Sequence, residues 1–517
     1  MTEPVDATER RTRLGTVFAA VLLGLFAMND IPIGIFQDDG HYLILARALA
    51  FGDGYRYTNL PGAPAGTHFP PGFPLLLAPL WWVAPHFPAN VVFFKLVNVA
   101  LLPLAALAAL AALAVRGFAR RVGGLSHLAA SVLAVVCVAT VPVLFLNGLL
   151  FSETAFIAAL CGTLVIAEQL ASRASPSWRR PVLVGLAVGA LALLRTVGLA
   201  VLPALLLWLM VRRRGRDAAW VLGGALMALA PWQAWTALHG HDVPASIAGG
   251  YGSYTGWLVD AYRAGGVPFA WSVLRENVRG LMMPLTLFGL IDAPRWVQAT
   301  AGLPLLAFLG VGVRVLWRRA PVTVLALSPY LLLLMVWPFP PDRFLWPLWP
   351  LILVAGVLGA QSLGWRAGAA MRQQVPVRVI AGALVVLFAA WHVQTWPSRN
   401  WERGERANAH MGFAAAGVAT ALPADGLVAS DMDAMVHLYA GRQAVPLLPL
   451  TAVQHVRARS DDEVAAQLEG VLRSYHPRWV LVTERESLRA AEVLARRGQL
   501  RFAGADSLGV VIYDVVP

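Results

Sequence analysis

Residues 36–74 read FQDDGHYLILARALAFGDGYRYTNLPGAPAGTHFPPGFP, a polar and aromatic-rich stretch that begins where the first long apolar segment ends. It opens on two adjacent carboxylates, Asp38 and Asp39, and many more apolar segments follow it. Polar loops held by a rigid scaffold often carry function, so we expect the chemistry of the chain here. The rest of the sequence bears on whether this loop is catalytic or only begins a helix.

The composition indicates a membrane protein. Of the 517 residues, 58% are hydrophobic and only 14% are charged, and the mean hydropathy is +0.62. In a soluble protein the formal charge of +12 would suggest a nucleic-acid partner, but most arginines sit in short clusters between apolar runs. Such clusters set membrane topology, and no basic face with interleaved aromatic residues accompanies them. We therefore expect membrane lipids as partners and no nucleic acid.

The first apolar segment predicts the orientation of the chain. Residues 14–35 supply about 20 mostly apolar residues, enough to cross a bilayer, and they follow a stretch that ends in arginines. We interpret them as a signal-anchor and not a cleaved signal peptide, because no small-x-small pattern precedes the aspartates. The positive-inside rule then places the N-terminus in the cytoplasm and Asp38 outside the inner membrane.

The later arginine clusters fit an alternation of about 11 spans. The expected spans cover residues 14–35, 90–115, 125–141, 150–170, a pair within 181–211, 218–237, 299–316, 322–337, 345–363 and 379–396. The pair within 181–211 is short, so we expect a break near Arg195 that neighbouring helices shelter. Residues 239–298 are expected to form a long outer loop.

From Pro397 the composition changes to that of a soluble domain, with frequent charges and apolar runs of strand length. The expected strands are 428–430, 444–447, 479–482, 500–504 and 509–513, and the expected helices are 461–475 and 486–497. This alternation predicts a small α/β sheet. The segment contains no Gly-rich phosphate loop, no nucleophile elbow and no residues at the spacing of metal ligands. We therefore expect a transmembrane catalytic domain over residues 1–396, with a catalytic outer loop at 36–88, and an extracytoplasmic accessory domain over 397–517.

The acidic pair allows two interpretations. One acid could cap a helix from Gly40 to Phe51, where it would also favour the helix dipole. Capping needs only one acid, however, and Asp38 would share a helix face with Tyr42. A carboxylate fixed at the membrane surface can act as a general base towards a hydroxyl, with Asp39 orienting the acceptor or a cation. The spacing alone does not decide between these two interpretations.

Two further loop segments carry polar candidates. His68 is either a ligand or an ordinary polar loop residue, and the apolar run after it suits the outer leaflet better than a span. His239, His241 and Asp242 could hold a divalent cation, although they lack the fixed geometry of a structural zinc site. The sequence therefore leaves metal use unknown. The Gly- and aromatic-rich residues 249–257 are typical of a sugar or lipid groove and equally of an interfacial loop.

Several motifs together resemble the GT-C glycosyltransferases, in particular the protein O-mannosyltransferases, the lipid A aminoarabinose transferase and their bacterial relatives. The acidic pair after the first span, a Gly-Asp-Gly-Tyr turn at 52–55 and a Pro-Pro-x-x-Pro segment at 70–74 resemble the first outer loop of that family. The later resemblances are FSET at 151–154, LLRTVGL at 193–199 and PDRFL at 341–345. The similarity covers roughly residues 14–400.

This chain departs from the family pattern at three positions. Asp39 stands where many relatives have Glu, which keeps the charge but shortens its reach. Arg195 stands where the aminoarabinose type often has Lys. A contact with phosphate would therefore be a bidentate pair of guanidinium hydrogen bonds and not the single charge of an ammonium group. Phe344 replaces the usual Tyr.

The resemblance implies a polytopic α-helical membrane protein that transfers a hexose or pentose from a polyprenyl-phosphate carrier. The acceptor would be a glycan, a lipid or a protein on the outer face. Asp38 would be the general base of an inverting reaction, with Asp39 in support. The implied phosphate or substrate contacts are Arg343 first, then Arg195 with Glu153, and Tyr42, His68 and Arg56.

The alternative class is a polytopic transporter or lipid flippase of envelope biogenesis. Such proteins place polar groups near the bilayer midplane in interrupted helices of paired repeats. Here the acids cluster at the outer surface, and only Arg195 favours transport.

Overall fold

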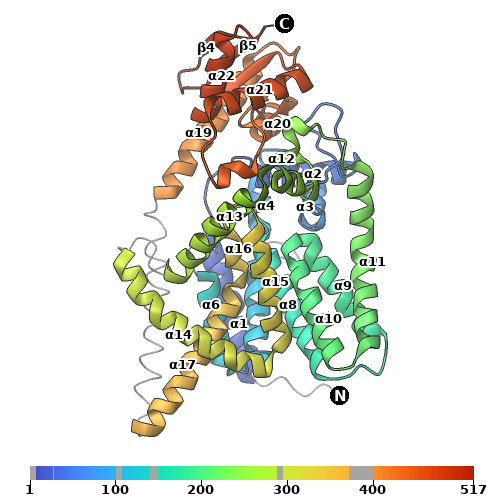
Figure 1. Cartoon of the computed structure of the whole chain (residues 1–517), viewed down its shortest axis with the longest axis vertical. Coiled ribbons are helices and arrows are strands. Elements are labelled where there is room, and N and C mark those ends of the chain that lie inside the picture. The colour runs from blue at the N-terminus through green and yellow to red at the C-terminus, as the bar shows by residue number, and fades with distance from the viewer. Residues whose placement is uncertain are drawn as a thin grey trace. The chain divides into compact units, whose positions relative to one another are not determined.

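The computed structural model describes residues 7–26, 28–99, 107–139, 149–287, 295–371 and 400–516. The chain forms two compact units, each assembled from three separated stretches. The first unit comprises Met1–Asn29, Lys95–Pro231 and Leu274–Ser398, and the second comprises Asp30–Phe94, Trp232–Val273 and Arg399–Pro517. Each unit is described by itself, and Figure 1 shows the helices and strands of both.

The first unit is a bundle of apolar helices. Its helices are α1 (Ala7–Phe26), α5 (Leu107–Arg121), α6 (His127–Ala139), α8 (Glu153–Ser172), α9 (Arg179–Leu194), η1 (Thr196–Ala200), α10 (Val201–Val211), most of α11 (Gly215–His239), α14 (Arg295–Arg319), α15 (Pro321–Val336), α16 (Asp342–Leu345), η3 (Trp346–Leu348) and α17 (Trp349–Met371). The short α4 (Val91–Val99) enters this unit at Lys95. Figure 1 shows α8, α10 and α15 standing side by side. Phe118, Phe156 and Trp349 lie fully buried in the common core of these helices.

Helix pairs in this unit approach closely where glycine occupies the contact. A Cβ atom on Gly312 of α14 would lie 1.7 Å from the carbonyl oxygen of Ala355 in α17, and one on Gly359 would lie 1.9 Å from that of Phe308. Only glycine allows such backbone contact, which is the usual way that helices associate in a membrane. Gly185 likewise brings α9 against α11. The sequence of this unit is therefore adapted to helix packing in lipid.

Three helices among the described residues are long and apolar enough to cross a membrane: Glu153–Ser172, Gly215–His239 and Arg343–Leu363. Four further apolar helices are shorter. The chain is a helical membrane protein, and the expected total of about 11 spans stays a prediction. The last expected span, 379–396, lies outside the described residues, as do parts of the spans at 90–115 and 125–141.

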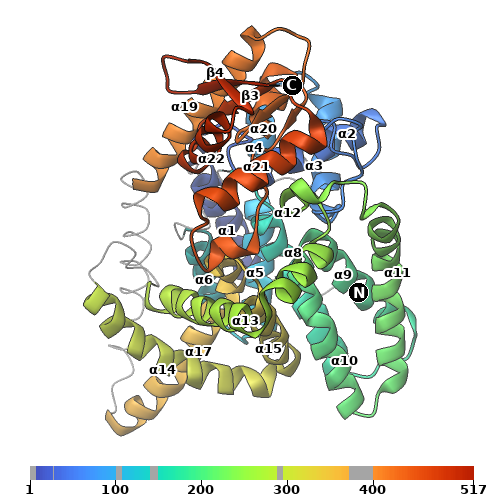
Figure 2. The same ribbon diagram turned by 45° about the horizontal axis from the view of Figure 1, so that its top comes forward.

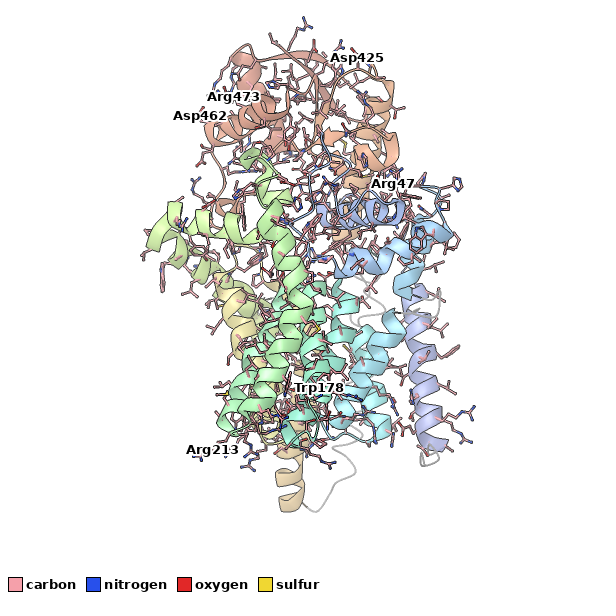
Figure 3. All side chains as sticks on the ribbon, turned by 90° about the vertical axis from the view of Figure 1, so that its right-hand side faces the viewer. Arg47, Trp178, Arg213, Asp425, Asp462 and Arg473 are labelled. Carbon is pink, nitrogen blue, oxygen red and sulfur yellow. The ribbon has the colours of Figure 1, made fainter. Side chains whose placement is uncertain are left out.

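The expected break near Arg195 is confirmed. Helix α9 ends at Leu194, and Arg195 adopts an extended conformation with φ −151° and ψ 127° before η1 begins. Trp178 before α9 and Arg213 after α10 both lie at one end of the bundle (Figure 3). The hairpin thus returns both flanking arginine clusters to the same end of this unit, as the positive-inside pattern requires.

The stretch 239–298, expected to form a long outer loop, is largely helical in its described part, and its expected outer position stays a prediction. Short helices η2 (Ala245–Ile247) and α12 (Ala248–Tyr251) lead into α13 (Tyr254–Leu287), which is kinked at Gly266. The kink needs glycine because Gly266 has φ 56° and ψ −156°. Val267 and Trp271 are strongly exposed, so the face of α13 that carries them suits the membrane interface. This stretch mixes small and aromatic residues without a regular apolar period, so its sequence does not predict a helix.

The second unit contains the first polar loop and a small sheet. The loop carries α2 (Gln37–Phe51) and α3 (Gly72–Val83). Helix α3 has 12 residues, about 18 Å at 1.5 Å per residue, too short to span a bilayer. The C-terminal stretch begins with α19 (Asn400–Ala421) and continues as an α/β segment (Figure 2).

The sheet has the order β2-β1-β3-β5-β4. Its strands are β1 (Val428–Ser430), β2 (Ala444–Val445), β3 (Trp479–Val482), β4 (Leu500–Ala505) and β5 (Val511–Val515), close to the five expected strands. β1 pairs in parallel with β2 and β3, and β5 pairs antiparallel with β3 and β4. The helices of the segment are α20 (Asp433–Ala440), η5 (Ala452–His455), α21 (Asp461–Tyr475) and α22 (Arg485–Arg496). The expected helix 461–475 is matched residue for residue.

Helices cover both faces of this sheet. Val428 and Leu481 point towards α19 and α20, where they share a core with Met435. Because side chains alternate along a strand, Val480 and Val482 point towards the opposite face, where α22 packs beside α21.

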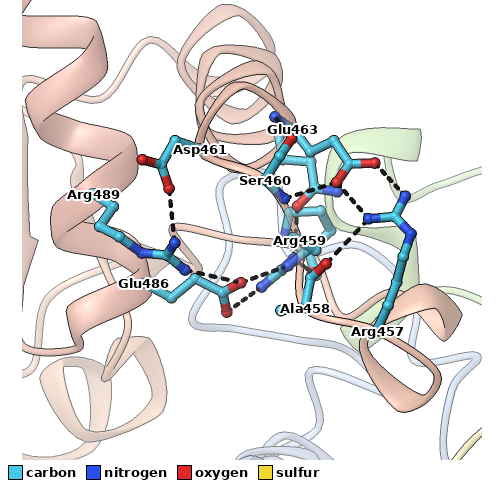
Figure 4. A network of polar contacts seen from close by, with 10 residues as sticks. Arg457, Ala458, Arg459, Ser460, Asp461, Glu463, Glu486 and Arg489 are labelled. Carbon is cyan, nitrogen blue, oxygen red and sulfur yellow. Dashed lines mark hydrogen bonds and ion pairs between the residues drawn. The ribbon is translucent and has the colours of Figure 1, made fainter.

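Ion pairs fix this second helical layer (Figure 4). Arg459 makes two hydrogen bonds to Glu486 of α22, at 3.0 and 2.7 Å, although Arg459 is only 4% exposed. Arg457 makes two more to Glu463 of α21. Forked arginine–carboxylate pairs of this kind set orientation as well as energy.

Candidate functional site

Helix α2 begins earlier than the sequence predicted. Its N-cap is Phe36 and its first residue is Gln37, so the expectation that Asp38 or Asp39 caps a helix from Gly40 is wrong. Both acids instead lie in the first turn, where unpaired backbone N–H groups and the helix dipole favour negative charge. Extended geometry at Phe36 starts the helix without a polar cap.

The two acids have different surroundings. Asp39 is 1% exposed, and its two carboxylate oxygens accept hydrogen bonds from the backbone N–H groups of Gly34 and Gly40, at 2.9 and 2.8 Å. These bonds tie the end of the preceding loop to the helix. Asp38 is half-buried, and its charge acts on the pKa of both His41 and His68. Asp39 therefore anchors the turn that presents Asp38.

The α/β segment packs directly on this turn. A Cβ atom at Gly40 would lie 2.7 Å from the Cβ of Ala434 in α20. Gly34, with φ 110°, sits against Met435 in the same way. Because any larger side chain at Gly40 would displace α20, the position of Asp38 depends on this contact.

Three aromatic rings surround His41, one helical turn after Asp38. The centroids of Tyr251, Tyr57 and Phe69 lie 4.4, 5.5 and 5.8 Å from that of the imidazole. His41 is fully buried, and neither ring nitrogen has a hydrogen-bond partner among the residues that the structure describes. Burial first, and then the neighbouring His68, lower the pKa of His41 to about 3, against the opposite pull of Asp38. His41 is therefore neutral at physiological pH.

His68 has a defined tautomer. Its Nδ1 lies 2.8 Å from the carbonyl oxygen of Gly252, and because a carbonyl only accepts, Nδ1 carries the proton. The Nε2 atom is then a hydrogen-bond acceptor. Burial lowers the pKa of His68 to about 4 despite the Gly252 contact, and its ring packs on Tyr254 with centroids 3.9 Å apart. A neutral, oriented imidazole can accept a hydrogen bond from a substrate hydroxyl.

Two other sequence-predicted residues of this loop have packing or turn contacts. Tyr42 is 5% exposed, with its ring 4.8 Å from Phe69 and 5.0 Å from Phe73. Arg56 donates from Nη1 to the carbonyl oxygen of Ala63 at 3.0 Å, which closes the turn of the loop.

The first unit contains a separate charge cluster. Oε1 of Glu153 lies 2.6 Å from Nη1 of Arg195 and 2.5 Å from Nε of Arg343. Arg195 also donates to Ser152 at 3.1 Å. Glu153 is fully buried, whereas the side chain of Arg343 is 32% exposed. One carboxylate thus holds two guanidinium groups, and the cluster keeps a net positive charge.

Aromatic rings support the same cluster. Arg343 lies over the ring of Phe151 at 4.0 Å, and Arg195 lies over that of Phe344 at 5.1 Å. Phe344 thus serves as a cation–π partner of Arg195. The structure pairs Glu153 with Arg195 as expected from their charges and adds Arg343 to the same carboxylate, which was not expected. Asp38, Asp39, Tyr42, His68 and Arg56 belong to the second unit.

Sequence reasoning missed a buried hydrogen-bond network in the second unit. The hydroxyl of Tyr251 donates to the carboxylate of Asp433 and accepts from Nδ2 of Asn59 at 2.6 Å. Burial raises the pKa of Asp433 to about 7. The aromatic-rich stretch 249–257 had drawn attention to Tyr251. Nothing in the sequence marked Asn59 or Asp433, because their contacts with Tyr251 join positions 192 and 182 residues apart.

A cavity of about 1040 Å³ lies beside this network. Its walls come from η2, α12, α13 and the stretch around η5, with small residues and the aromatic side chains of Trp257 and Phe269. His241, Asp260 and Arg457 supply polar groups. Gly252, whose carbonyl accepts from His68, is part of the wall. The volume suits a ligand of the size of a small glycan or lipid headgroup.

The candidate cation ligands do not converge in the described residues. His239 Nδ1 and Asp242 Oδ2 are 2.9 Å apart, which makes them a surface pair. Within the described part of the chain, no three His, Cys, Asp or Glu side chains form a ligand set.

No protein-family model matches the sequence, and no curated protein matches it significantly. Solved structures do resemble the fold. An oligosaccharyltransferase from Archaeoglobus fulgidus, in complex with zinc and sulfate, superposes with a TM-score of 0.56 at 14% identity, covering 97% of this chain and 73% of that one. ArnT from Cupriavidus metallidurans in the apo state superposes with a TM-score of 0.55 at 13% identity, covering 97% of each chain.

A further structure of the Archaeoglobus protein, AglB, contains an inhibitory peptide and a dolichol-phosphate, and it superposes with a TM-score of 0.53 at 14% identity, covering 98% of this chain and 74% of that one. These similarities establish the fold. The chain therefore shares the fold of these proteins over nearly its whole length.

Proposed function

We propose that the protein transfers a sugar from a polyprenyl-phosphate carrier to an acceptor hydroxyl on the outer face of the membrane. The observation that carries this proposal is the GT-C fold over nearly the whole chain, combined with a half-buried carboxylate, Asp38, at an anchored helix start. The complex of AglB with dolichol-phosphate supports a lipid-phosphate donor.

In the proposed reaction Asp38 is the general base. It takes the proton of the acceptor hydroxyl while that oxygen attacks the anomeric carbon and the bond from this carbon to the phosphate oxygen breaks. Attack from the face opposite the leaving group gives inversion. Asp39 accepts hydrogen bonds from two backbone N–H groups and holds the turn in place.

The lipid phosphate leaves with increased negative charge, which cationic groups stabilise. Arg343 and Arg195 are the proposed phosphate contacts, because together they exceed the charge of Glu153 by one. Arg343 is the more accessible of the two. The pairing with Glu153 keeps both guanidinium groups oriented before the donor binds.

The acceptor is proposed to occupy the cavity along α13. His68 would accept a hydrogen bond from an acceptor hydroxyl through Nε2, and Trp257 would offer an apolar wall to a sugar ring or a lipid. Tyr42 and Arg56 are proposed to shape the loop around this region without contacting substrate.

The test uses the purified full chain in proteoliposomes with undecaprenyl-phosphate-linked hexoses and pentoses that carry a radiolabel on the sugar. Envelope lipids, glycans and proteins are supplied separately as acceptors. We expect labelled acceptor and free undecaprenyl phosphate to appear in equal amounts. Movement of intact labelled donor between leaflets without release of undecaprenyl phosphate would support the transporter or flippase alternative, which the buried Arg195 at a helix break favours.

A further inference from the structure

A clamp of three residues holds Tyr251 in the wall around His41. Tyr251, Asn59 and Asp433 are each at most 1% exposed, so their polar groups have little access to water. The Tyr251 hydroxyl donates a hydrogen bond to the Asp433 carboxylate and accepts one from the Asn59 side-chain amide. With its hydroxyl fixed at both sides, the tyrosine ring has one position. In a dry interior these two hydrogen bonds to the hydroxyl favour a single ring position, while Oδ1 of Asn59 has no partner among the described residues.

The clamp joins three distant parts of the chain. Asn59 belongs to the first polar loop, Tyr251 ends α12, and Asp433 begins α20 of the α/β segment. The same α20 packs through Ala434 on Gly40, directly after the acidic pair. The α/β segment therefore contacts the turn that carries Asp38 and also the ring that covers His41.

A protonated His41 would compete with the acceptor hydroxyl for the carboxylate of Asp38. The two residues are three positions apart on α2 and so share a face of the helix. A protonated imidazole there would pair with Asp38 and weaken it as a base, because a nearby opposite charge favours the ionised carboxylate. Burial behind Tyr57, Phe69 and Tyr251 opposes that protonation.

We propose that Tyr251, clamped by Asp433 and Asn59, is a positioning residue that seals the aromatic wall around His41 and keeps it from pairing with Asp38. This inference rests on the proposed role of Asp38 as general base. It assigns a part in that reaction to the α/β segment, which the sequence had suggested to be accessory. Around His41, the other titratable groups are Asp38 on its own helix, His68 and Tyr57 on the loop and Tyr251 on α12.

The first experiment measures protonation and needs no substrate. Histidine labelled with ¹³C at Cε1 is incorporated into the full chain in detergent, and the His41→Gln variant assigns its signal among the 11 histidines. In the parent protein the His41 signal is expected to stay constant between pH 5 and 8. In Tyr251→Ala it is expected to titrate near pH 6.5, the ordinary imidazole pKa.

The second experiment measures turnover of the undecaprenyl-phosphate sugar that serves as donor in the test above. For Tyr251→Ala, kcat/KM at pH 5.5 should be about tenfold lower than at pH 8, because protonation one pH unit below the midpoint leaves about a tenth of His41 neutral. The double variant Tyr251→Ala/His41→Gln should lose this pH dependence. A structural defect alone would lower kcat/KM of the single and the double variant equally at both pH values.

Two matched carboxylate variants locate the clamp. Asp433→Asn keeps an acceptor for the Tyr251 hydroxyl and should retain the parent pH profile, whereas Asp433→Leu should shift it as Tyr251→Ala does. Asp431→Leu is the control, since Asp431 accepts hydrogen bonds from Thr483 and Glu484 at the sheet and not from Tyr251. It should lower stability without changing the pH profile.

The proposal is overturned if the His41 signal in Tyr251→Ala stays constant from pH 5 to 8. It is also overturned if the double variant keeps the pH dependence of the single one. If the parent protein turns over none of the sugar donors, the proposed function fails, while the titration of His41 still decides whether the wall keeps this residue neutral.

Discussion

Replacing Glu153 by Gln tests whether the charge cluster of the first unit is held by one carboxylate. The change removes the negative charge between Arg195 and Arg343 while keeping the size and hydrogen-bonding atoms of the side chain. Glu153 is fully buried and Arg195 is only 10% exposed, so water screens this pair weakly. Removing one partner of a buried pair costs about 3–5 kcal/mol. The contact to Arg343 adds little because that side chain is 32% exposed.

Thermal unfolding of the purified protein in detergent measures this cost, and we expect a midpoint lower by several degrees. The matched control is Glu168→Gln on the same helix. Glu168 accepts from the backbone N–H and the hydroxyl of Thr323, at 2.6 and 2.8 Å, and an amide oxygen can replace it without leaving a cation unpaired. Equal shifts for the two variants would refute the reasoning, because the cost would then not come from the stranded arginine.

Three further predictions concern other parts of the chain. Arg343→Lys keeps the charge but loses the Nε–H contact to Glu153, so kcat/KM for the lipid-linked donor should fall about tenfold; an unchanged kcat/KM would remove Arg343 from phosphate binding. Gly40→Ala places a Cβ against Ala434 and should lower stability by about 1–3 kcal/mol, measured by thermal unfolding. Gly417→Ala is the control and should leave stability unchanged, because a Cβ there meets open space. An equal loss of stability in the two variants would contradict the contact between Gly40 and α20. Burial raises the pKa of Asp433 from 3.8 to about 7, so its folded state binds a proton that the unfolded state has lost, and stability should fall as pH rises from about 4 to 7. Asp433→Asn should reduce that fall in unfolding titrations, and an unchanged pH dependence would show that the group is not titrating there.

The sequence predicted well those features that depend on local pattern. The strands and helices of the α/β segment follow from short apolar runs alternating with helical periodicity. The break at Arg195 follows from a hairpin of 31 residues (181–211) flanked by arginine clusters. The pairing of Glu153 with Arg195 follows from the cost of leaving either charge alone in an apolar helix pair.

Features that depend on tertiary contact were less predictable. The start of α2 at Gln37 could not be read from the acids, because the helix begins without a side-chain cap. Residues after His239 combine glycines, aromatics and a kink at Gly266, so α13 has no regular apolar period. The clamp between Asn59, Tyr251 and Asp433 depends on a fold that brings three distant segments together, and single residues carry no local signal of it.

The central claim is that Asp38 is the base of a sugar transfer. The most direct measurement is the rate of transfer from the radiolabelled undecaprenyl-phosphate sugar in proteoliposomes for Asp38→Asn, with Asp53→Asn in the exposed turn of the same loop as control. We predict that Asp38→Asn lowers kcat by about 10²–10⁴-fold, with KM for the donor unchanged, and that Asp53→Asn retains the parent rate. Unchanged transfer by Asp38→Asn would contradict the account.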